Sequence, residues 1–349
     1  MSSMSAASPV TSGENDNVTS AKSELLHILA SLHEMAEVDT LIRSTLLSES
    51  SVLTEIPLYL LELGGKRMRP ALTLLCSRAF GLENAPREVI DVAAGIELIH
   101  MATLLHDDII DKSPRRRHQE SPFRKYGTPK TLLSGDFLLV RAFSLCARLD
   151  RFVINETEKA CIELTEGEVN EFAIPIEEHT LDSSLEIARK KTAALFRLAA
   201  TCGAHLAGAT PSTVSAMSAY GENLGIAFQI LDDILDVTAD EDLLGKPSGI
   251  DILERKPSYP NVLWLSSGDP RAQEVFLGEP LQQNSPELIS AIAELRESPY
   301  ILESQTKAKS HVHQALDALA QAEQEAVRTN ANAFEALRTL ARFTLERML

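Results

Sequence analysis

The sequence predicts an all-α fold, a single-domain bundle of antiparallel helices. Leu, Ala and Glu dominate the 349 residues and aromatic residues make up only 5%, whereas strands favour aromatic and β-branched residues. Apolar residues also recur at spacings of three and four, and no useful stretch alternates as a strand does. Hydrophobic residues form 44% of the chain, enough for a large core. We therefore expect one helical domain over 23–349, after a disordered tail over 1–22.

The expected helices follow one another between clusters of helix-breaking residues. A long one covers the stretch around 89–107, where Val89, Ile96, His100 and Asp107 lie on one face. Similar periodicity covers 185–208, 212–238 and 303–349. Glycine and proline clusters separate the segments, at 63–65, 113–114, 127–129, 245–247, 257–260 and 268–270.

Charge and cysteine content narrow the classes of function. The net charge of −17 argues against binding to nucleic acids, whose phosphates require a basic surface. No apolar run reaches the length of a membrane span, and the N-terminus lacks the features of a secretory signal. The four cysteines form no CxxC pair and lie in apolar segments, as reduced core cysteines do. We therefore expect a cytoplasmic protein that does not bind nucleic acid and does not span a membrane.

Two DDxxD motifs each end an apolar helical segment. One such motif arises by chance in roughly 8% of chains this long, and two in well under 1%. The first and fifth positions share a helix face, about 6 Å apart along the axis. Carboxylates so spaced suit Mg²⁺, which keeps waters and adds phosphate oxygens. The six carboxylates are Asp107, Asp108, Asp111, Asp232, Asp233 and Asp236.

A solvated acidic face is the simpler alternative for both motifs. However, acidic side chains at the C-terminal end of a helix oppose its macrodipole and need a counter-charge. Two such motifs on facing helices therefore predict a clamp that holds a diphosphate through several Mg²⁺ ions.

Concentrated positive charge stands beside these acidic motifs. In the segment 64–69, two glycines permit a tight turn and three cations follow at a helix start, where a bound anion is favoured. The run Arg115-Arg116-Arg117 follows the first aspartate motif, and arginine forks match phosphate oxygens. His100 lies two turns before Asp107 on the same face, and we interpret it as a further diphosphate ligand.

Either basic cluster alone could equally be a surface patch, but beside two Mg²⁺ motifs phosphate binding is favoured. Five more polar side chains complete the expected site, although each could by itself be an ordinary surface residue: Lys191, Thr192, Gln229, Lys246 and Lys256.

With these residues in place, the chain resembles the trans-polyprenyl diphosphate synthases, most closely their long-chain octaprenyl, solanesyl and decaprenyl group. The resemblance runs from about Leu60 to about Leu265. Its segments are GGKRMRP, IELIHMATLLHDDIID, RRR, SGDFLLVRAF, EGE, ARKKTAALF, GIAFQILDDILD and LLGKPSGID. It implies an isoprenoid synthase-like bundle around a deep central cavity, a homodimer, and Mg²⁺-dependent addition of isopentenyl diphosphate to an allylic diphosphate.

The resemblance also divides the polar residues into three groups. The isopentenyl diphosphate site comprises Lys66, Arg69, His100 and Arg117. The allylic diphosphate site comprises Arg116, Lys191, Lys246 and Lys256, with Thr192 and Gln229 facing the developing cation. The Mg²⁺ ligands are Asp107, Asp111 and Asp232, supported by Asp108, Asp233 and Asp236; three ions per site are expected, and Mn²⁺ is expected to substitute.

Several positions depart from the family pattern. His118 stands in place of the usual glycine after the arginine pair, and Pro114-Arg115 precede that pair. Glu171 stands where the family has Gln. The segment 258–260 replaces a Thr-Leu-Pro-like sequence near Lys256.

Three other functions share part of this pattern. A class I terpene cyclase ionises the same substrates, but it needs no isopentenyl site. A non-catalytic subunit of a heteromeric synthase typically loses aspartates, and both motifs are complete here. A helical scaffold with incidental acidic motifs would bind no Mg²⁺-diphosphate.

Product length depends on side chains one or more turns before Asp107, because the growing chain runs along that helix. In short-chain relatives a bulky aromatic residue or Met at the first two positions blocks the path. Here these positions are Ala102 and Thr103, with Ile99 and Ile96 further along. We expect products of about C30–C50, with about C40 as the favoured length. A short-chain farnesyl or geranylgeranyl product is the alternative.

Overall fold

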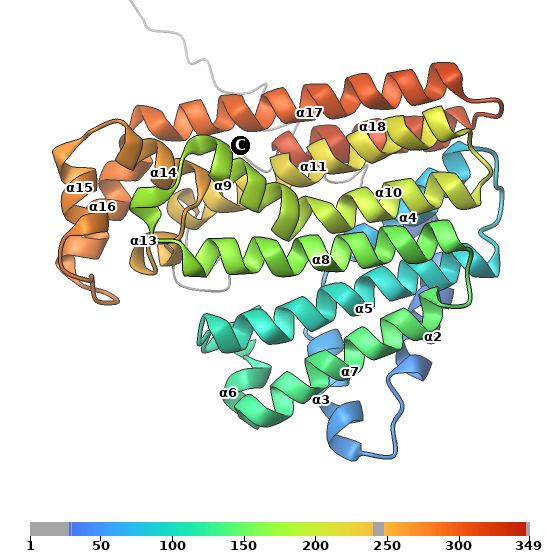
Figure 1. The fold of residues 1–349 in the computed structure, drawn as a ribbon, viewed down its shortest axis with the longest axis horizontal. Helices are drawn as coiled ribbons and strands as arrows, with labels where there is room; N and C mark the ends of the chain where they lie inside the picture. Colours follow the sequence, from blue (N-terminus) through green and yellow to red (C-terminus); the bar gives the residue numbers. More distant parts are fainter. Residues whose placement is uncertain (1–27, 29, 240–247, 347–349) are drawn as a thin grey trace, which may run out of the picture.

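The computed structural model describes residues 28, 30–239 and 248–346, and within them the chain is almost entirely helical (Figure 1). This confirms the all-α prediction. The strands of the described part are two residues each, β1 (Arg115–Arg116) and β2 (Gln119–Glu120), and they form one antiparallel hairpin. The predicted tail over 1–22 and Lys246 lie outside the described residues.

The N-terminal half of the bundle is built around α5 (Arg87–Ile110), the helix that carries the first aspartate motif. Its neighbours include α4, α7, α2 and α10, and most of its side chains are buried. By length and composition α5 could span a membrane, but its burial in the core identifies it as the central helix of the bundle. The other helices of this half are α2 (Glu34–Thr45), α3 (Ser51–Glu62), α4 (Met68–Ala79), α6 (Pro122–Tyr126) and α7 (Thr128–Cys146).

The second half supplies the opposite wall of the bundle. A continuous helical run consists of α9 (Leu181–Ile187), a π-turn η2 (Ala188–Ala193) and α10 (Ala194–Leu206). The long helix α11 (Pro211–Thr238) carries the second aspartate motif, and it packs against α10, η2 and α17. The helix α8 (Arg151–Ala173) packs against η2. The short 3-10 helix η1 (Ile176–Glu178) follows α8 in the chain.

The C-terminal segment differs from the sequence-based expectation in one respect. The periodic stretch 303–349 is divided between α17 (Pro299–Glu325) and α18 (Ala331–Glu346). Asn330 marks the break, because its side-chain Oδ1 accepts the backbone N–H groups of Asn332 and Ala333 and so caps α18. The remaining helices are α13 (Ile250–Leu253), α14 (Tyr259–Ser266), α15 (Pro270–Leu277) and α16 (Pro286–Glu297), which gather at one end of the bundle (Figure 1).

Two apolar cores support these layers. The larger includes Ile96 and Tyr220 and joins the N-terminal helices to α10, α11 and α18. The smaller includes Trp264 and Phe276 and attaches α14–α16 to the end of α11. All four cysteines are free thiols, and three of them are buried, in agreement with the sequence-based interpretation. The aspartate-bearing ends of α5 and α11 contribute to the lining of one cavity.

Candidate active site

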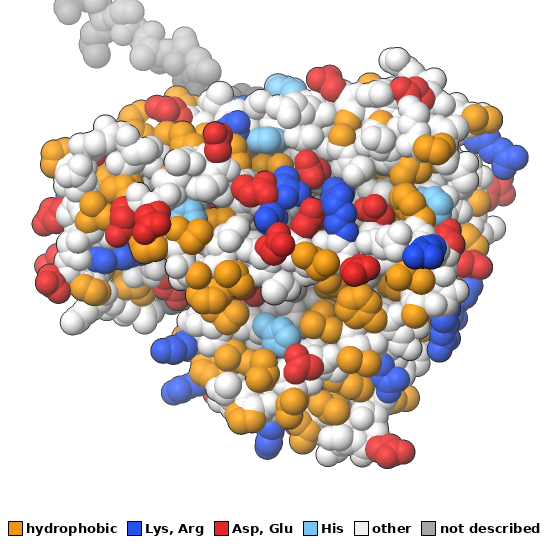
Figure 2. Space-filling model, in the orientation of Figure 1, with side chains coloured by type: hydrophobic (Ala, Val, Ile, Leu, Met, Phe, Trp, Pro, Cys, Tyr) orange, Lys and Arg blue, Asp and Glu red, His pale blue; other side chains and the backbone are white. Residues whose placement is uncertain are grey.

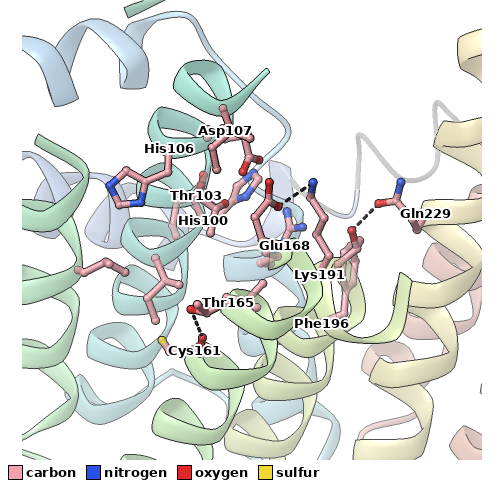
Figure 3. A pocket seen from close by; sticks show the side chains of 18 of the residues that line it. His100, Thr103, His106, Asp107, Cys161, Thr165, Glu168, Lys191, Phe196 and Gln229 are labelled. Carbon is pink, nitrogen blue, oxygen red and sulfur yellow. Dashed lines mark hydrogen bonds and ion pairs between the residues drawn. The ribbon is translucent and has the colours of Figure 1, made fainter. Parts of the chain in front are cut away.

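A cavity of about 1060 Å³ lies between α4, α5, α7, α8, η2, α10 and α11. It is at the upper end of the range for small-molecule sites. In Figure 3, Asp107, Glu168, Lys191 and Gln229 lie across its upper part, and Thr165 and Cys161 lie lower in the view. Apolar residues form most of the remaining lining: Ile99, Leu104, Ile110, Leu132, Leu139, Phe143, Leu164, Val169, Phe172, Phe196 and Phe228. The cavity therefore combines a polar region with a wall suited to a hydrocarbon chain.

The two aspartate motifs contribute carboxylates to the same cavity. Asp107 enters it from α5 and Asp232 from α11. Burial raises the pKa of Asp107 to about 7, and the nearby Lys191 only partly offsets this effect. The raised pKa indicates that nearby positive charge does not fully compensate an ionised Asp107 carboxylate. A divalent cation would supply the missing positive charge.

The described side chains contain no group of three or more His, Cys, Asp or Glu residues already close enough to hold a metal ion. The carboxylates instead approach from opposite walls, an arrangement that suits Mg²⁺ completed by water and phosphate oxygens. The donor set therefore fits Mg²⁺ bound together with a diphosphate.

The supporting aspartates fix the elements around the cavity. Asp108 is fully buried and accepts Arg116 Nε (2.9 Å) and Nη2 (2.6 Å) on one oxygen, while its other oxygen has no hydrogen bond. Arg116 therefore contacts Asp108 and is absent from the cavity lining among the described residues. Asp233 accepts Gln229 Nε2 (2.7 Å) and the backbone N–H of Tyr259 (3.2 Å).

Asp236 and Asp111 connect the segment 251–256 to the two aspartate motifs. The backbone N–H of Asp251 donates to Asp236 Oδ2 at 3.0 Å. Lys256 donates to Asp111 Oδ2 at 3.1 Å and also pairs with Glu254. The segment 258–260, whose sequence differs from the family pattern, forms the start of α14. It contacts Asp233 through the backbone N–H of Tyr259. Its unusual side chains are therefore compatible with this contact.

The predicted isopentenyl diphosphate ligands come from the loop before α4, from α4 and α5, and from the turn between β1 and β2. Lys66, Arg69, His100 and Arg117 all line the cavity. The Arg117 guanidinium lies against Gly65, 2.9 Å from where a Cβ would stand, and the φ of +138° at Gly65 also favours glycine. The glycine turn and the arginine run thus meet in space.

The buried, positively charged side chains of this cluster favour binding of an anion. Arg69 stacks over Phe196, 4.8 Å from the ring centroid, and its buried Nε has no hydrogen-bond partner. Burial, reinforced by the positive charge of Arg69, Arg116 and Arg117, holds the pKa of His100 well below its usual range. A neutral imidazole next to several guanidinium groups can donate one hydrogen bond to a phosphate without adding further like charge.

The π-turn η2 presents Lys191 and Thr192 to the opposite side of the cavity. Lys191 Nζ lies 2.7 Å from Glu168 Oε2 and also contacts Glu171. The Thr192 hydroxyl donates to the side-chain oxygen of Gln229. Although burial alone would lower it, the pKa of Lys191 is raised by the surrounding carboxylates, first Glu171 and then Asp107.

Gly167 explains how α8 comes this close. A Cβ at Gly167 would lie 2.7 Å from the backbone nitrogen of Lys191, so only glycine permits the contact. The EGE segment therefore sets α8 against η2 and places Glu168 beside Lys191.

A second, smaller cavity of about 210 Å³ adjoins the first and shares Lys191, Gln229 and Asp232 with it. Its further polar lining consists of Glu171, Ser184, Asp233, Asp236, Asp251, Lys256 and Ser258. The structure thus brings the second aspartate motif together with two of the predicted allylic cations.

The structure corrects one expectation about the path of the growing chain. Thr103 and Ile99 line the large cavity, but Ala102 and Ile96 do not and are fully buried among neighbouring helices. A turn of 100° per residue separates Ala102 from the face centred on Thr103. Only one of the two positions before the motif therefore faces the cavity.

Several lining residues were missed by the sequence interpretation. Glu97 pairs with Arg67 at 2.6 Å beside the isopentenyl cations. Phe196 and Phe228, which pack together with centroids 5.3 Å apart, close the wall near Gln229. Glu97 could have been found from its spacing of three before His100, whereas isolated phenylalanines in apolar helices carry no such signal.

Comparison with known proteins agrees with this geometry. A family model described as polyprenyl synthetase matches residues 50–296. The octaprenyl diphosphate synthase of Escherichia coli (strain K12) is 34% identical over 289 residues, covering 82% of this chain and 89% of that protein. A short chain isoprenyl diphosphate synthase of Methanothermobacter thermautotrophicus is 34% identical over 340 residues, covering 93% and 99%.

A solved structure gives the same result. The polyprenyl synthase of Caulobacter crescentus CB15, complexed with calcium and isoprenyl diphosphate, superposes with a TM-score of 0.83 and 32% identity, over 92% of this chain and 97% of that one. The fold and the paired aspartate motifs therefore define an isoprenoid synthase. More particularly, the chain belongs to the polyprenyl synthetase family, and it is a prenyltransferase of isoprenoid biosynthesis.

Proposed function

We propose that this enzyme adds isopentenyl diphosphate units to an allylic diphosphate in trans, with Mg²⁺, and releases a linear long-chain polyprenyl diphosphate. The observation that carries this proposal is the convergence of Asp107, Asp232 and Lys191 on the polar part of an otherwise apolar cavity. Carboxylates and a cation at the same place suit a metal-bound diphosphate, and the apolar wall suits its hydrocarbon chain.

In this proposal Asp107, Asp111 and Asp232 would hold Mg²⁺, which would supply positive charge to the diphosphate that leaves as the allylic C–O bond breaks. Lys191, Lys246 and Lys256 hold the same diphosphate, and Arg116 acts through Asp108. The hydroxyl of Thr192 and the amide of Gln229 present oxygen dipoles to the allylic cation. The cavity wall excludes water that would otherwise capture the cation.

Coupling, rather than cyclisation, is supported by the second group of cations. Lys66, Arg69, His100 and Arg117 all line the cavity, and a cyclase would have no use for a second anion site. Their positions would hold isopentenyl diphosphate so that its double bond attacks the allylic C1.

A long product is supported by the small side chain of Thr103, which leaves the cavity open between α5 and the facing side chains of α7 and α8. We propose a product of about C40 on this basis. The relatives named above include both octaprenyl and short-chain enzymes, so a farnesyl or geranylgeranyl product is the second candidate.

We also propose a homodimer in the cytoplasm. Large apolar side chains stand exposed along α7 (Leu132, Leu133, Val140, Phe143) and α8 (Ile162, Val169, Phe172), and apolar surface gathers on that part of the face in Figure 2. Four of them, Leu132, Phe143, Val169 and Phe172, also line the cavity, so a second copy packed there would close its wall. Such a patch favours a protein partner, and free thiols suit a reducing compartment.

Incubation of the purified chain with isopentenyl diphosphate, Mg²⁺ and dimethylallyl, geranyl, farnesyl or geranylgeranyl diphosphate tests the proposal directly. Sizing the products gives the primer and the length together. Turnover that does not depend on isopentenyl diphosphate would contradict coupling, and a clean monomer by light scattering would contradict the dimer.

A further inference from the structure

Glu171 places an additional carboxylate on Lys191, at a position where the family pattern has Gln. The Lys191 ammonium contacts both Glu168 and Glu171. All three side chains are largely shielded from solvent, with exposed fractions of 20% for Lys191 and 17% for each glutamate. Two carboxylates therefore share one ammonium, and the ionised trio carries a net charge of −1.

The backbone holds this trio in place. Glu168 and Glu171 are three residues apart on α8, so both face the same neighbour. The contact of Gly167 with η2 fixes the distance between the two helices. Lys191 stands at the junction of the two cavities, with Glu168 lining the larger and Glu171 lining the smaller.

The charge of Glu171 also reaches the rest of the allylic site. Although burial lowers it, the pKa of the Lys256 ammonium is raised first by Asp251 and then by Glu171. The negative charge of Glu171 would therefore repel a diphosphate in the small cavity, where Lys191 and Lys256 are the cations of the lining.

We propose that Glu171 keeps Lys191 in a carboxylate-paired state that an incoming diphosphate must displace, so that Glu171 weakens diphosphate binding at the allylic site. This inference rests on the proposed function, because that function assigns Lys191 to the allylic diphosphate. A diphosphate competes with Glu171 for the same N–H donors and is repelled by its charge. Glutamine keeps the hydrogen-bond acceptor but removes the charge.

The weaker binding has a use in repeated elongation. Each addition leaves an inorganic diphosphate that must depart before the extended chain is bound again. Glu171 re-forms its pair with Lys191 as the diphosphate leaves, and it thereby favours release.

The test compares inorganic diphosphate binding, measured by calorimetry in excess Mg²⁺, for the full chain and the Glu171→Gln variant. We expect the variant to bind about 10-fold more tightly and to show a KM for the allylic substrate lowered by a similar factor, with the KM for isopentenyl diphosphate unchanged. Glu166→Gln is the matched control. Glu166 lies on the same helix and pairs with Lys190 at 2.8 Å, but it is half exposed and lines neither cavity.

Two results would overturn the inference: Glu171→Gln binding no tighter than the wild type, or an equal gain in Glu166→Gln. In a Lys191→Ala background, Glu171→Gln should give a smaller gain, because only the direct repulsion of the diphosphate remains to be removed, and a full gain there would also contradict pairing as the cause. Thermal melting checks that each variant folds. If the wild type neither binds diphosphate nor consumes isopentenyl diphosphate, the proposed function itself fails; an active wild type with an unchanged Glu171→Gln variant overturns only this inference.

Discussion

Lys256 Nζ lies 3.1 Å from Asp111 Oδ2, so an ion pair spans 145 residues and joins the end of the first aspartate motif to the loop that follows the second. Both side chains are about one-fifth exposed. The pair therefore connects the two segments that carry or follow the aspartate motifs.

The buried charge of Asp107 should destabilise the metal-free protein. Its pKa in the folded protein is about 7, above the value of 3.8 expected when it is unfolded. Because the folded pKa is raised, the penalty is absent below pH 3.8, grows as the pH rises from 3.8 to about 7, and is constant above that. Asp107→Asn should therefore stabilise the metal-free protein at pH 8, by on the order of 2 kcal/mol, and less at pH 5.

Thermal melts with chelator at both pH values measure this effect. The same substitution should abolish stabilisation by Mg²⁺ with diphosphate and lower turnover by orders of magnitude. Asp39→Asn, at an exposed helical pair, is the control. A variant that is destabilised at pH 8 yet turns over normally would contradict the assignment of Asp107.

The two diphosphate sites should separate kinetically. Arg69→Ala should raise the KM for isopentenyl diphosphate, and Lys256→Ala should raise that for the allylic substrate, each by about 10- to 100-fold, as expected for one charge-assisted contact. Lys190→Ala removes a neighbouring cation that lines neither cavity and should leave both values unchanged. Steady-state kinetics with each substrate varied in turn makes the distinction. If both variants affected the same substrate, the partition of the cavity would be incorrect.

Product length should respond to Thr103 rather than to Ala102. Thr103→Phe places a ring in the cavity and should shorten the product with the fold intact. Ala102→Phe instead inserts a ring into a fully packed region and should cost about 1–3 kcal/mol of stability. Chromatography of the products and denaturant unfolding together tell the two apart. A shortened product from a fully stable Ala102→Phe variant would favour the original sequence-based expectation.

The hairpin between β1 and β2 should become more stable when glycine replaces His118. Arg117 and His118 form its turn with φ values of 51° and 65°, a conformation that favours glycine. His118→Gly should therefore stabilise the protein by about 0.5–1 kcal/mol, which denaturant unfolding can resolve. Gln119→Gly, in the adjacent strand residue, should have the opposite sign, and a loss of stability in both would exclude strain at the turn.

The sequence was most informative where a chemical requirement repeats at fixed spacing. The aspartate motifs, the glycine-cation turn and the long helices could be predicted because each depends on local order. The division of roles within a motif could not, since Asp107 faces the cavity while Asp108 is turned toward Arg116 by one residue of helical rotation. Ala102 was misplaced for the same reason. The contact between Gly167 and Lys191 joins separate helices, and no local pattern encodes it.

The π-turn η2 makes this part of the enzyme sensitive to chain length. A π-turn accommodates about one residue more than an α-helical turn, so a deletion within Ala188–Ala193 could be absorbed by a regular helix with little loss of backbone hydrogen bonding. The protein would fold with α9 and α10 in register, but the residues between them would lose the wider turn that directs their side chains. Lys191 and Thr192 could then no longer share the cavity while α10 keeps its place in the core. A single-codon deletion here is thus a change that would spare the fold and remove the chemistry.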